Sequence, residues 1–191
     1  MPASRRTLVA TAALPLIVAL AAACGGGGSA AKPADPTPDA LARGIAAQNA
    51  NKIDEATTAY FEVLSSDPKN KFAYYNLGQI ARLQNKFAIA EGYYRSALET
   101  DPNFGVALFG LGATRQALNA IDDAISVYRK DISVEPNNAA AHYNLGILLR
   151  IQGKTAEGDA EIARGIQLDP KLPQPGPATT VKPTPTASPT R

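Results

Sequence analysis

The sequence predicts an all-α protein, a solenoid of about four helix-turn-helix repeats between two tails that are expected to be disordered. Three observations lead to this prediction. Alanine is abundant, tryptophan is absent and only 6% of the residues are aromatic, a composition that favours helices over a strand-rich core. No segment shows the period-two, β-branched pattern of a strand. A set of residues also recurs every 34 positions over most of the chain, which is typical of a repeat architecture.

The repeat is clearest in four pairs of an acidic residue and a proline. These pairs are Asp67-Pro68, Asp101-Pro102, Glu135-Pro136 and Asp169-Pro170. With each proline at position 32 of a unit, the repeats span 37–70, 71–104, 105–138 and 139–172, and the repeat domain spans 39–172. Proline at this position ends the second helix of a unit, because it restrains the residue before it.

Four further positions repeat in register and explain how two helices pack as a hairpin. Position 8 holds Gly44, Gly78, Gly112 and Gly146; position 20 holds Ala56, Ala90, Ala124 and Gly158; position 24 holds Tyr60, Tyr94, Tyr128 and Ile162; and position 15 holds Asn51, Asn85, Asn119 and Gly153. Small residues at positions 8 and 20 let the helices approach closely, and the aromatic residue is expected to fill the gap between hairpins. Asparagine and glycine best tolerate the left-handed conformation that ends a helix, so the chain should reverse at position 15.

This pattern resembles the tetratricopeptide repeat (TPR), an antiparallel helix pair, over residues 37–172. The resemblance implies that the first helices line a concave groove for a peptide or protein, with positions 2, 5, 6, 9, 12 and 13 facing the ligand. The predicted groove residues are Phe72, Tyr75, Asn76, Gln79, Arg82, Phe109, Gln116, Tyr143, Asn144, Ile147 and Arg150, with Leu41, Ile45, Gln48, Val106 and Ala113 at equivalent positions.

The predicted groove is apolar and aromatic, with amides and two arginines. This chemistry suits a peptide with apolar anchors and an acidic group, lying across the face from Tyr75 to Arg150. This groove is similar to that of chaperone-binding TPR domains, in which an asparagine holds the ligand backbone; Asn76 and Asn144 match that asparagine. Those domains also bind two carboxylates of the ligand with a clamp of basic residues. The basic positions of the clamp hold Leu41, Val106 and Gly110 here, so ligands that depend on the clamp are rejected.

Several residues depart from the repeat pattern. Ala40 and Arg43 replace larger or apolar residues, as expected of a first unit that faces solvent. Asp131 replaces the usual alanine at position 27, which casts doubt on tight packing of the third repeat against the fourth. The last helix is expected to be its own polar cap, since its outward face over 156–168 was assigned the charged residues Glu157, Asp159, Glu161 and Arg164.

The first 23 residues read as a signal peptide. Arg5 and Arg6 precede an apolar run over 8–23, which is short for a membrane-spanning helix. The following Leu-Ala-Ala-Ala-Cys resembles the lipobox of bacterial lipoproteins, which implies that Cys24 is acylated and becomes the mature N-terminus. Two acyl chains suffice for stable anchoring. An uncleaved anchor and a cytosolic chain are the alternatives, and the route, Sec or twin-arginine, stays open.

The predicted location is the extracytoplasmic face of a cell membrane, inner or outer. Residues 24–38 are predicted to form a lipidated, flexible tether. Residues 173–191 are predicted to form a Pro/Thr-rich disordered tail. The tail could be glycosylated, contact the cell wall or fold into the groove, and a plain disordered tail is the other alternative. Without Arg5 and Arg6, the 19 basic residues become 17, equal to the 17 acidic ones. A neutral mature chain lacks the positive charge of a nucleic-acid-binding protein.

Catalysis is not expected. His142 is the only histidine and occupies position 4, a packing position held by Tyr74 and Leu108 in other repeats. No catalytic triad, phosphate-binding loop or metal-ligand cluster occurs, so no enzyme activity, cofactor or metal is predicted. The predicted function is a scaffold that binds an envelope protein or peptide. The alternatives are an assembly factor for pili or outer-membrane proteins and a lipoprotein that binds a small apolar ligand.

Overall fold

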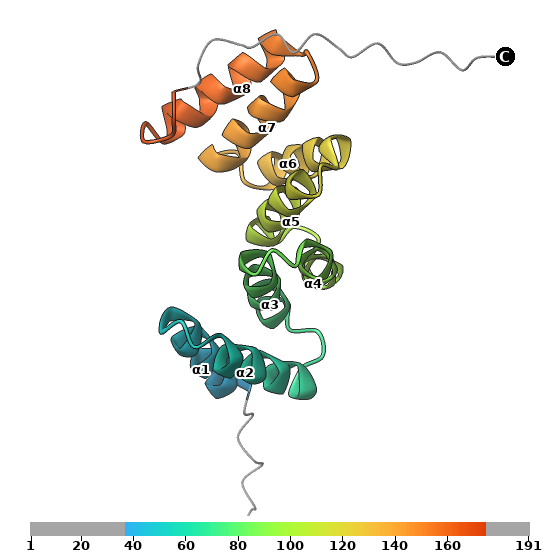
Figure 1. Cartoon of the computed structure of the whole chain (residues 1–191), viewed down its shortest axis with the longest axis vertical. Coiled ribbons are helices and arrows are strands. Elements are labelled where there is room, and N and C mark those ends of the chain that lie inside the picture. The colour runs from blue at the N-terminus through green and yellow to red at the C-terminus, as the bar shows by residue number, and fades with distance from the viewer. Residues whose placement is uncertain (1–36, 175–191) are drawn as a thin grey trace, which may run out of the picture. The chain divides into compact units, whose positions relative to one another are not determined.

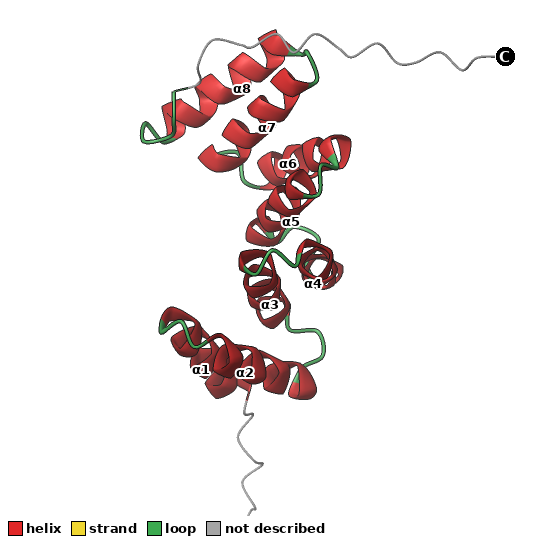
Figure 2. Ribbon diagram, viewed as in Figure 1, coloured by secondary structure: helices red, strands yellow, loops and turns green. Residues whose placement is uncertain are grey.

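The computed structural model describes residues 37–174, which form four antiparallel helix pairs in chain order (Figures 1 and 2). The helices are α1 (Thr37–Asn49), α2 (Ile53–Ser66), α3 (Lys71–Leu83), α4 (Phe87–Thr100), α5 (Gly105–Ala117), α6 (Ile121–Val134), α7 (Ala139–Ile151) and α8 (Thr155–Leu168). We call the pairs hairpins 1 to 4. No strand occurs within 37–174, which confirms the all-α prediction. The signal peptide, Cys24 and most of both predicted tails lie outside the described residues.

The turn inside each hairpin is left-handed at one residue, as the asparagine pattern predicts. Asn51, Asn85 and Asn119 have φ values of 57°, 57° and 58°, and Gly153 has φ 80°. The turn of hairpin 1 is closed by the backbone N–H of Lys52, which donates to the carbonyl of Ala47 at 2.8 Å. Such bonds satisfy carbonyls that the helix end leaves without partners.

The position-24 tyrosines pack against the glycine of their own hairpin and in the same buried clusters as residues of the next hairpin, as expected of side chains that fill the gap between hairpins. A Cβ atom added at Gly44 would lie 2.5 Å from Cε1 of Tyr60, so the ring occupies the space that glycine leaves. The Tyr94 ring lies against glycines of two hairpins. A Cβ atom added at Gly78 of hairpin 2 would lie 2.8 Å from Tyr94 Cε1, and one added at Gly110 of hairpin 3 would lie 2.6 Å from it.

Hairpin 1 ends the array with a charged surface. Arg43 contacts Asp39 at 3.2 Å and Glu62 at 2.8 Å, at the position where Leu77, Leu111 and Leu145 are buried. The expected exposure of Arg43 is therefore found. The same expectation is wrong for Ala40, which is buried in the core between α1 and α2.

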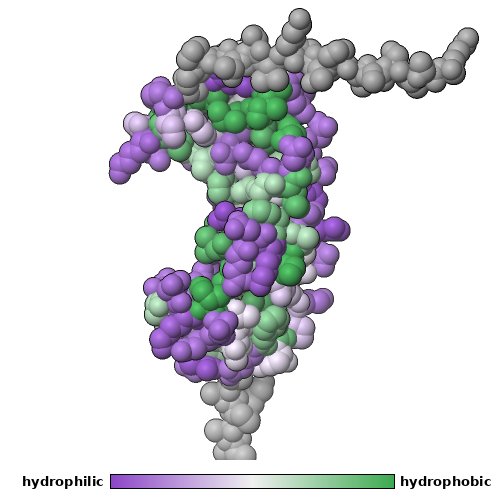
Figure 3. Space-filling model, in the orientation of Figure 1, coloured by the Kyte–Doolittle hydropathy of each residue, from purple (hydrophilic) through white to green (hydrophobic). Residues whose placement is uncertain are grey.

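The prediction of an outward cap on α8 is wrong for two of its four charged residues, Glu157 and Glu161, whereas Asp159 and Arg164 are exposed. Glu157 pairs with Arg129 of α6 at 2.6 Å, and Glu161 contacts His142 of α7 at 2.6 Å. Since these glutamates are four residues apart, they share one side of the helix, and that side faces the preceding helices. The exposed side of α8 has a hollow of about 430 Å³, lined by Asp159, Ile162, Ala163, Ile166, Gln167 and Gln174. Figure 3 shows hydrophobic surface (green) on the pair formed by α7 and α8.

None of the eight helices within 37–174 combines the length and the apolar character that crossing a bilayer requires.

Candidate functional site

The first helices of the hairpins carry most of the exposed hydrophobic side chains. Eight large hydrophobic residues within 37–174 are exposed. Five of them occupy ligand-facing positions of α1, α3, α5 and α7: Ile45, Phe72, Leu83, Val106 and Ile151. We call the surface formed by these positions the first-helix face. Soluble proteins seldom leave rows of large hydrophobic residues uncovered without a binding role.

An aromatic cluster lies where hairpin 2 meets hairpin 3. Phe72 and Tyr75 of α3 both contact Phe104, with ring centroids 5.4 and 5.6 Å apart, and Tyr75 lies 6.2 Å from Tyr94. The ammonium group of Lys71 lies 5.3 Å from the Phe72 ring and 4.8 Å from the Phe104 ring, which is within cation–π range. The same ammonium group is paired with Asp101 at 2.5 Å, so the cluster offers aromatic surface next to an ion pair.

A chain of hydrogen bonds joins hairpins 1 and 2 across this face. The Tyr60 hydroxyl donates to Gln48 at 2.9 Å, and the Gln48 amide donates to Gln79 at 3.3 Å. The Gln79 amide in turn donates to the Tyr75 hydroxyl. These bonds fix the orientation of Gln79 and Tyr75, two of the predicted groove residues, before any ligand binds.

A second polar group joins hairpins 3 and 4. The Asn144 amide donates to the Tyr128 hydroxyl at 3.2 Å, and this hydroxyl donates to Gln116 at 3.2 Å. The ring of Phe109 lies 5.9 Å from that of Tyr128. Burial raises the pKa of Tyr128 to about 12, so its hydroxyl stays protonated and available as a donor at neutral pH.

The two groove arginines have different surroundings. Arg82 lies near two tyrosine hydroxyls. Burial raises the pKa of Tyr94, and the hydrogen bond and charge of Arg82 oppose this rise. Burial also raises the pKa of Tyr75, and the charge of Arg82 opposes that rise too. Arg150 instead reaches Asp159 of its own hairpin at 3.5 Å and is largely buried. Arg82 is therefore the better placed of the two to meet a ligand near the aromatic cluster.

The remaining predicted groove residues are half-buried. Asn76 donates to the carbonyl of Phe72 at 2.9 Å within α3, and Tyr143 and Ile147 lie along α7. Sequence reasoning missed Lys71 and Phe104. Phe104 occupies the N-cap position of α5, where Asn70 and Asn138 cap α3 and α7 with their side chains. An aromatic residue at a position suited to a capping residue was the signal that could have identified it.

Charge is segregated between the two layers of helices. Helices α3, α5 and α7 contain no aspartate or glutamate, whereas α2, α4, α6 and α8 together contain eleven. The cations of these helices are largely paired with carboxylates of other segments: Lys71 with Asp101, Arg115 with Glu91 and Arg150 with Asp159. The first-helix face therefore combines hydrophobic side chains with cations that are mostly neutralised.

The one histidine of the chain lies in a packed position of α7. His142 is 7% exposed and holds a packing position with contacts to Glu161 and Pro136. Within 37–174, no group of three or more His, Cys, Asp or Glu residues could hold a metal ion.

The fold and its repeated turns define the class: an α-helical repeat protein of stacked hairpins. The tetratricopeptide repeat family model matches residues 41–103 and 103–173, and the chain belongs to this family. A comparison with curated proteins finds no significant match.

Solved structures share the fold. One is a crystal structure of MamA, with a TM-score of 0.66 and 20% identity, covering 72% of this chain and 80% of the other. Another is MamA from Desulfovibrio magneticus RS-1, residues 41 to the end, with a TM-score of 0.63 and 18% identity, covering 72% and 77%. A third is the first TPR domain of Spaghetti (RPAP3) bound to an HSP90 peptide, SRMEEVD, with a TM-score of 0.59 and 26% identity, covering 61% and 93%.

Proposed function

We propose that this protein is a membrane-anchored TPR lipoprotein of the bacterial cell envelope. It acts as a non-enzymatic scaffold that binds a peptide or protein segment on the first-helix face. TPR domains bind peptides and proteins, and TPR proteins are generally scaffolds without catalytic activity, so membership of the family supports this role. The observation that carries the binding proposal is the row of exposed hydrophobic residues on one layer of helices.

The ligand we propose is a segment with apolar side chains and an acidic group. The apolar side chains lie against Phe72 and Val106, and the acidic group lies near Arg82, beside Tyr75 and Tyr94. The RPAP3 domain is bound to an HSP90 peptide that contains acidic residues. We do not transfer that peptide to this chain, since Leu41, Val106 and Gly110 occupy the positions of the basic clamp.

Paired variants test the binding proposal. In Phe72→Ala, Val106→Ala, two exposed residues of the first-helix face are shortened; in Phe61→Ala, Ile89→Ala, two similarly exposed residues of second helices are shortened. Phe72 is 47% exposed and Phe61 is 48% exposed, so the pairs match in size and exposure. Proximity labelling in cells first identifies the partners, and pull-downs then compare the variants.

We expect the first pair of substitutions to weaken capture of these partners at least tenfold, because truncation of the few anchor residues that dominate an interface costs about 2 kcal/mol or more each. The control pair should leave capture unchanged, with the same helical circular dichroism in both variants. Equal capture by both pairs contradicts the proposed binding surface.

The anchor is tested separately at Cys24, the single cysteine of the chain. Cells are grown with an alkyne-labelled fatty acid, and the wild-type chain and Cys24→Ala are compared for labelling and for membrane fractionation. We expect the variant to lose both. Retention of the variant in the membrane fraction contradicts acyl anchoring, whatever the outcome of the binding test.

Two narrower roles remain as alternatives. Loss of pili or of an outer-membrane protein upon gene deletion would favour an assembly factor. A small molecule retained in native mass spectrometry would favour a lipoprotein for apolar ligands.

A further inference from the structure

The contact between hairpins 3 and 4 contains a buried carboxylate. Asp131 of α6 is 0% exposed and occupies the position of Val63, Ala97 and Gly165 in the other hairpins. Its Oδ2 accepts a hydrogen bond from the Asn138 amide at 2.9 Å, and its Oδ1 has no hydrogen-bond partner among the described residues. A buried oxygen without a partner is costly, and more so when it carries charge.

The charges around Asp131 do not neutralise it. Burial is the main reason that its pKa rises from 3.8 to about 7, and Glu135 at the end of α6 raises it further. The Asn138 hydrogen bond and His142 of α7 oppose the rise. Tyr128 of α6 is the other titratable group that interacts with Asp131, and Glu161 of α8 faces His142.

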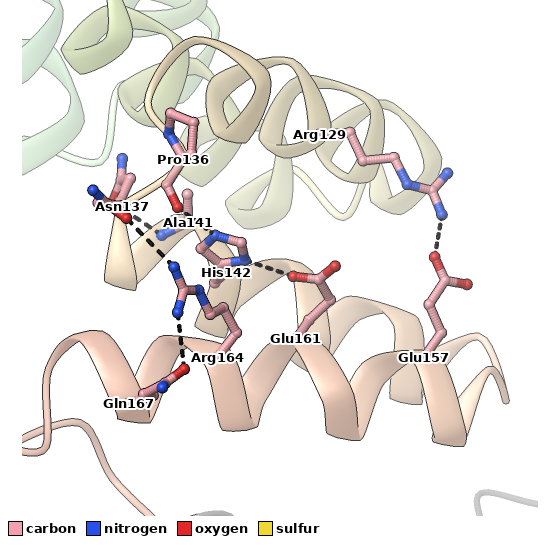
Figure 4. Close-up of polar contacts among 10 residues, drawn as sticks. Arg129, Pro136, Asn137, Ala141, His142, Glu157, Glu161, Arg164 and Gln167 are labelled. Carbon is pink, nitrogen blue, oxygen red and sulfur yellow. Dashed lines mark hydrogen bonds and ion pairs between the residues drawn. The ribbon is translucent and has the colours of Figure 1, made fainter.

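His142 is the second titratable group at this contact. Its Nδ1 lies 2.6 Å from Glu161 Oε2, and its Nε2 lies 3.0 Å from the carbonyl oxygen of Pro136 (Figure 4). Both neighbours are acceptors. A neutral imidazole donates from one nitrogen only, so the ring makes both bonds only when it is protonated. In hairpin 2, the neutral Tyr74 hydroxyl makes the equivalent bond to Pro68 at 3.1 Å.

Protonation of Asp131 makes the contact stronger at low pH. Between the unfolded and folded pKa values of Asp131, the folded state holds a proton that the unfolded state has lost, so stability falls as pH rises from about 4 to about 7.

We propose that the contact between hairpins 3 and 4 is a proton-sensitive hinge, closed when Asp131 is protonated and loosened when it has lost the proton. The hinge bears on the first-helix face, since the hydrogen bond from Asn144 to Tyr128 crosses this contact. Loosening it separates the α7 part of the face from the rest. In a repeat protein, a terminal hairpin can open without unfolding the others. The inference holds whatever the face binds.

The test is hydrogen exchange of the full chain, followed by mass spectrometry at pH 5 and pH 8 and corrected for intrinsic exchange rates. We expect protection of α7 and α8 to fall between the two pH values by at most about a hundredfold, because about two of the three pH units over which stability falls lie above pH 5. Protection of α1 to α4 should change much less. Equal protection of α7 and α8 at both pH values overturns the proposal.

Two variants assign the effect. Asp131→Asn keeps the shape of the side chain but cannot ionise, so the pH dependence should disappear. Asp123→Asn, an exposed position on the same helix, should behave like the wild type. If Asp131→Asn keeps the full pH dependence, the hinge is not controlled by this residue and the proposal fails.

Discussion

The first and last hairpins follow one 34-residue pattern but treat the ends of the array in opposite ways. Hairpin 1 places Arg43, with its acidic partners, on the outer surface and keeps its interior apolar. Hairpin 4 directs Glu157 toward hairpin 3 and Glu161 toward its own first helix, and it leaves a largely apolar hollow bordered by Asp159 outside. A repeat can therefore be adapted to an end by exchanging a few positions, and the exchange decides whether polar groups lie outside or at an internal contact.

The largest expected loss of stability comes from placing in hairpin 4 the arginine that hairpin 1 has at position 7, where hairpin 4 has Leu145. In Leu145→Arg, a guanidinium replaces a side chain that is 2% exposed, and a buried charge without a partner costs about 3–5 kcal/mol. Urea unfolding followed by circular dichroism should show loss of hairpin 4 at low denaturant. The reverse exchange, Arg43→Leu, should change the midpoint little, because its ion pairs are exposed. Equal midpoints for the two variants would refute the difference between the ends.

A smaller effect is expected where the helices of hairpin 4 touch. A Cβ atom at Gly146 would lie 2.5 Å from the carbonyl oxygen of Gly158, and neither backbone can yield easily. Gly146→Ala should therefore lower the free energy of unfolding by roughly 1–3 kcal/mol. Gly92→Ala is the control, since a Cβ atom there meets nothing within 4 Å; it should raise stability by up to about 1 kcal/mol. Thermal melts of both variants give the comparison.

The smallest effects concern the turns. Asn51→Ala should cost about 1 kcal/mol, because alanine resists the left-handed conformation, whereas Asn51→Gly should be nearly neutral. In hairpin 4, Gly153→Asn introduces the residue of the other three turns and should stabilise by about 0.5 kcal/mol, since it restricts the unfolded chain. A loss of stability in Gly153→Asn would show that the fourth turn, with φ 80° rather than 57°, needs glycine itself.

The parts of the fold that depend on local chemistry could be predicted from the sequence. The left-handed turns follow from asparagine or glycine at position 15, and each hairpin follows from the 34-residue spacing of its small residues. These features depend only on residues within a single repeat, and the residues responsible recur at the same positions in all four repeats.

The parts that depend on contacts between hairpins could not be predicted. The direction of Glu157 and Glu161 depends on Arg129 and His142, which come from two other helices. Phe104 joins the aromatic cluster because it lies between two hairpins, and no single-repeat consensus shows such a position. The sequence shows Asp131 in place of the usual alanine where hairpin 3 meets hairpin 4. That its Oδ1 atom has no hydrogen-bond partner among the described residues follows only from the packed side chains around it.

The position of Tyr94 also has a mechanical consequence. Its ring lies against Gly78 in hairpin 2 and against Gly110 in hairpin 3, so these two hairpins cannot part without exposing it. When the chain is pulled from its two ends, the terminal hairpins are expected to detach at lower force, and the central pair is expected to resist longest. A force-extension trace should then show small early steps followed by a larger late one. Under load, the aromatic cluster of the first-helix face is the last part of that surface to be lost.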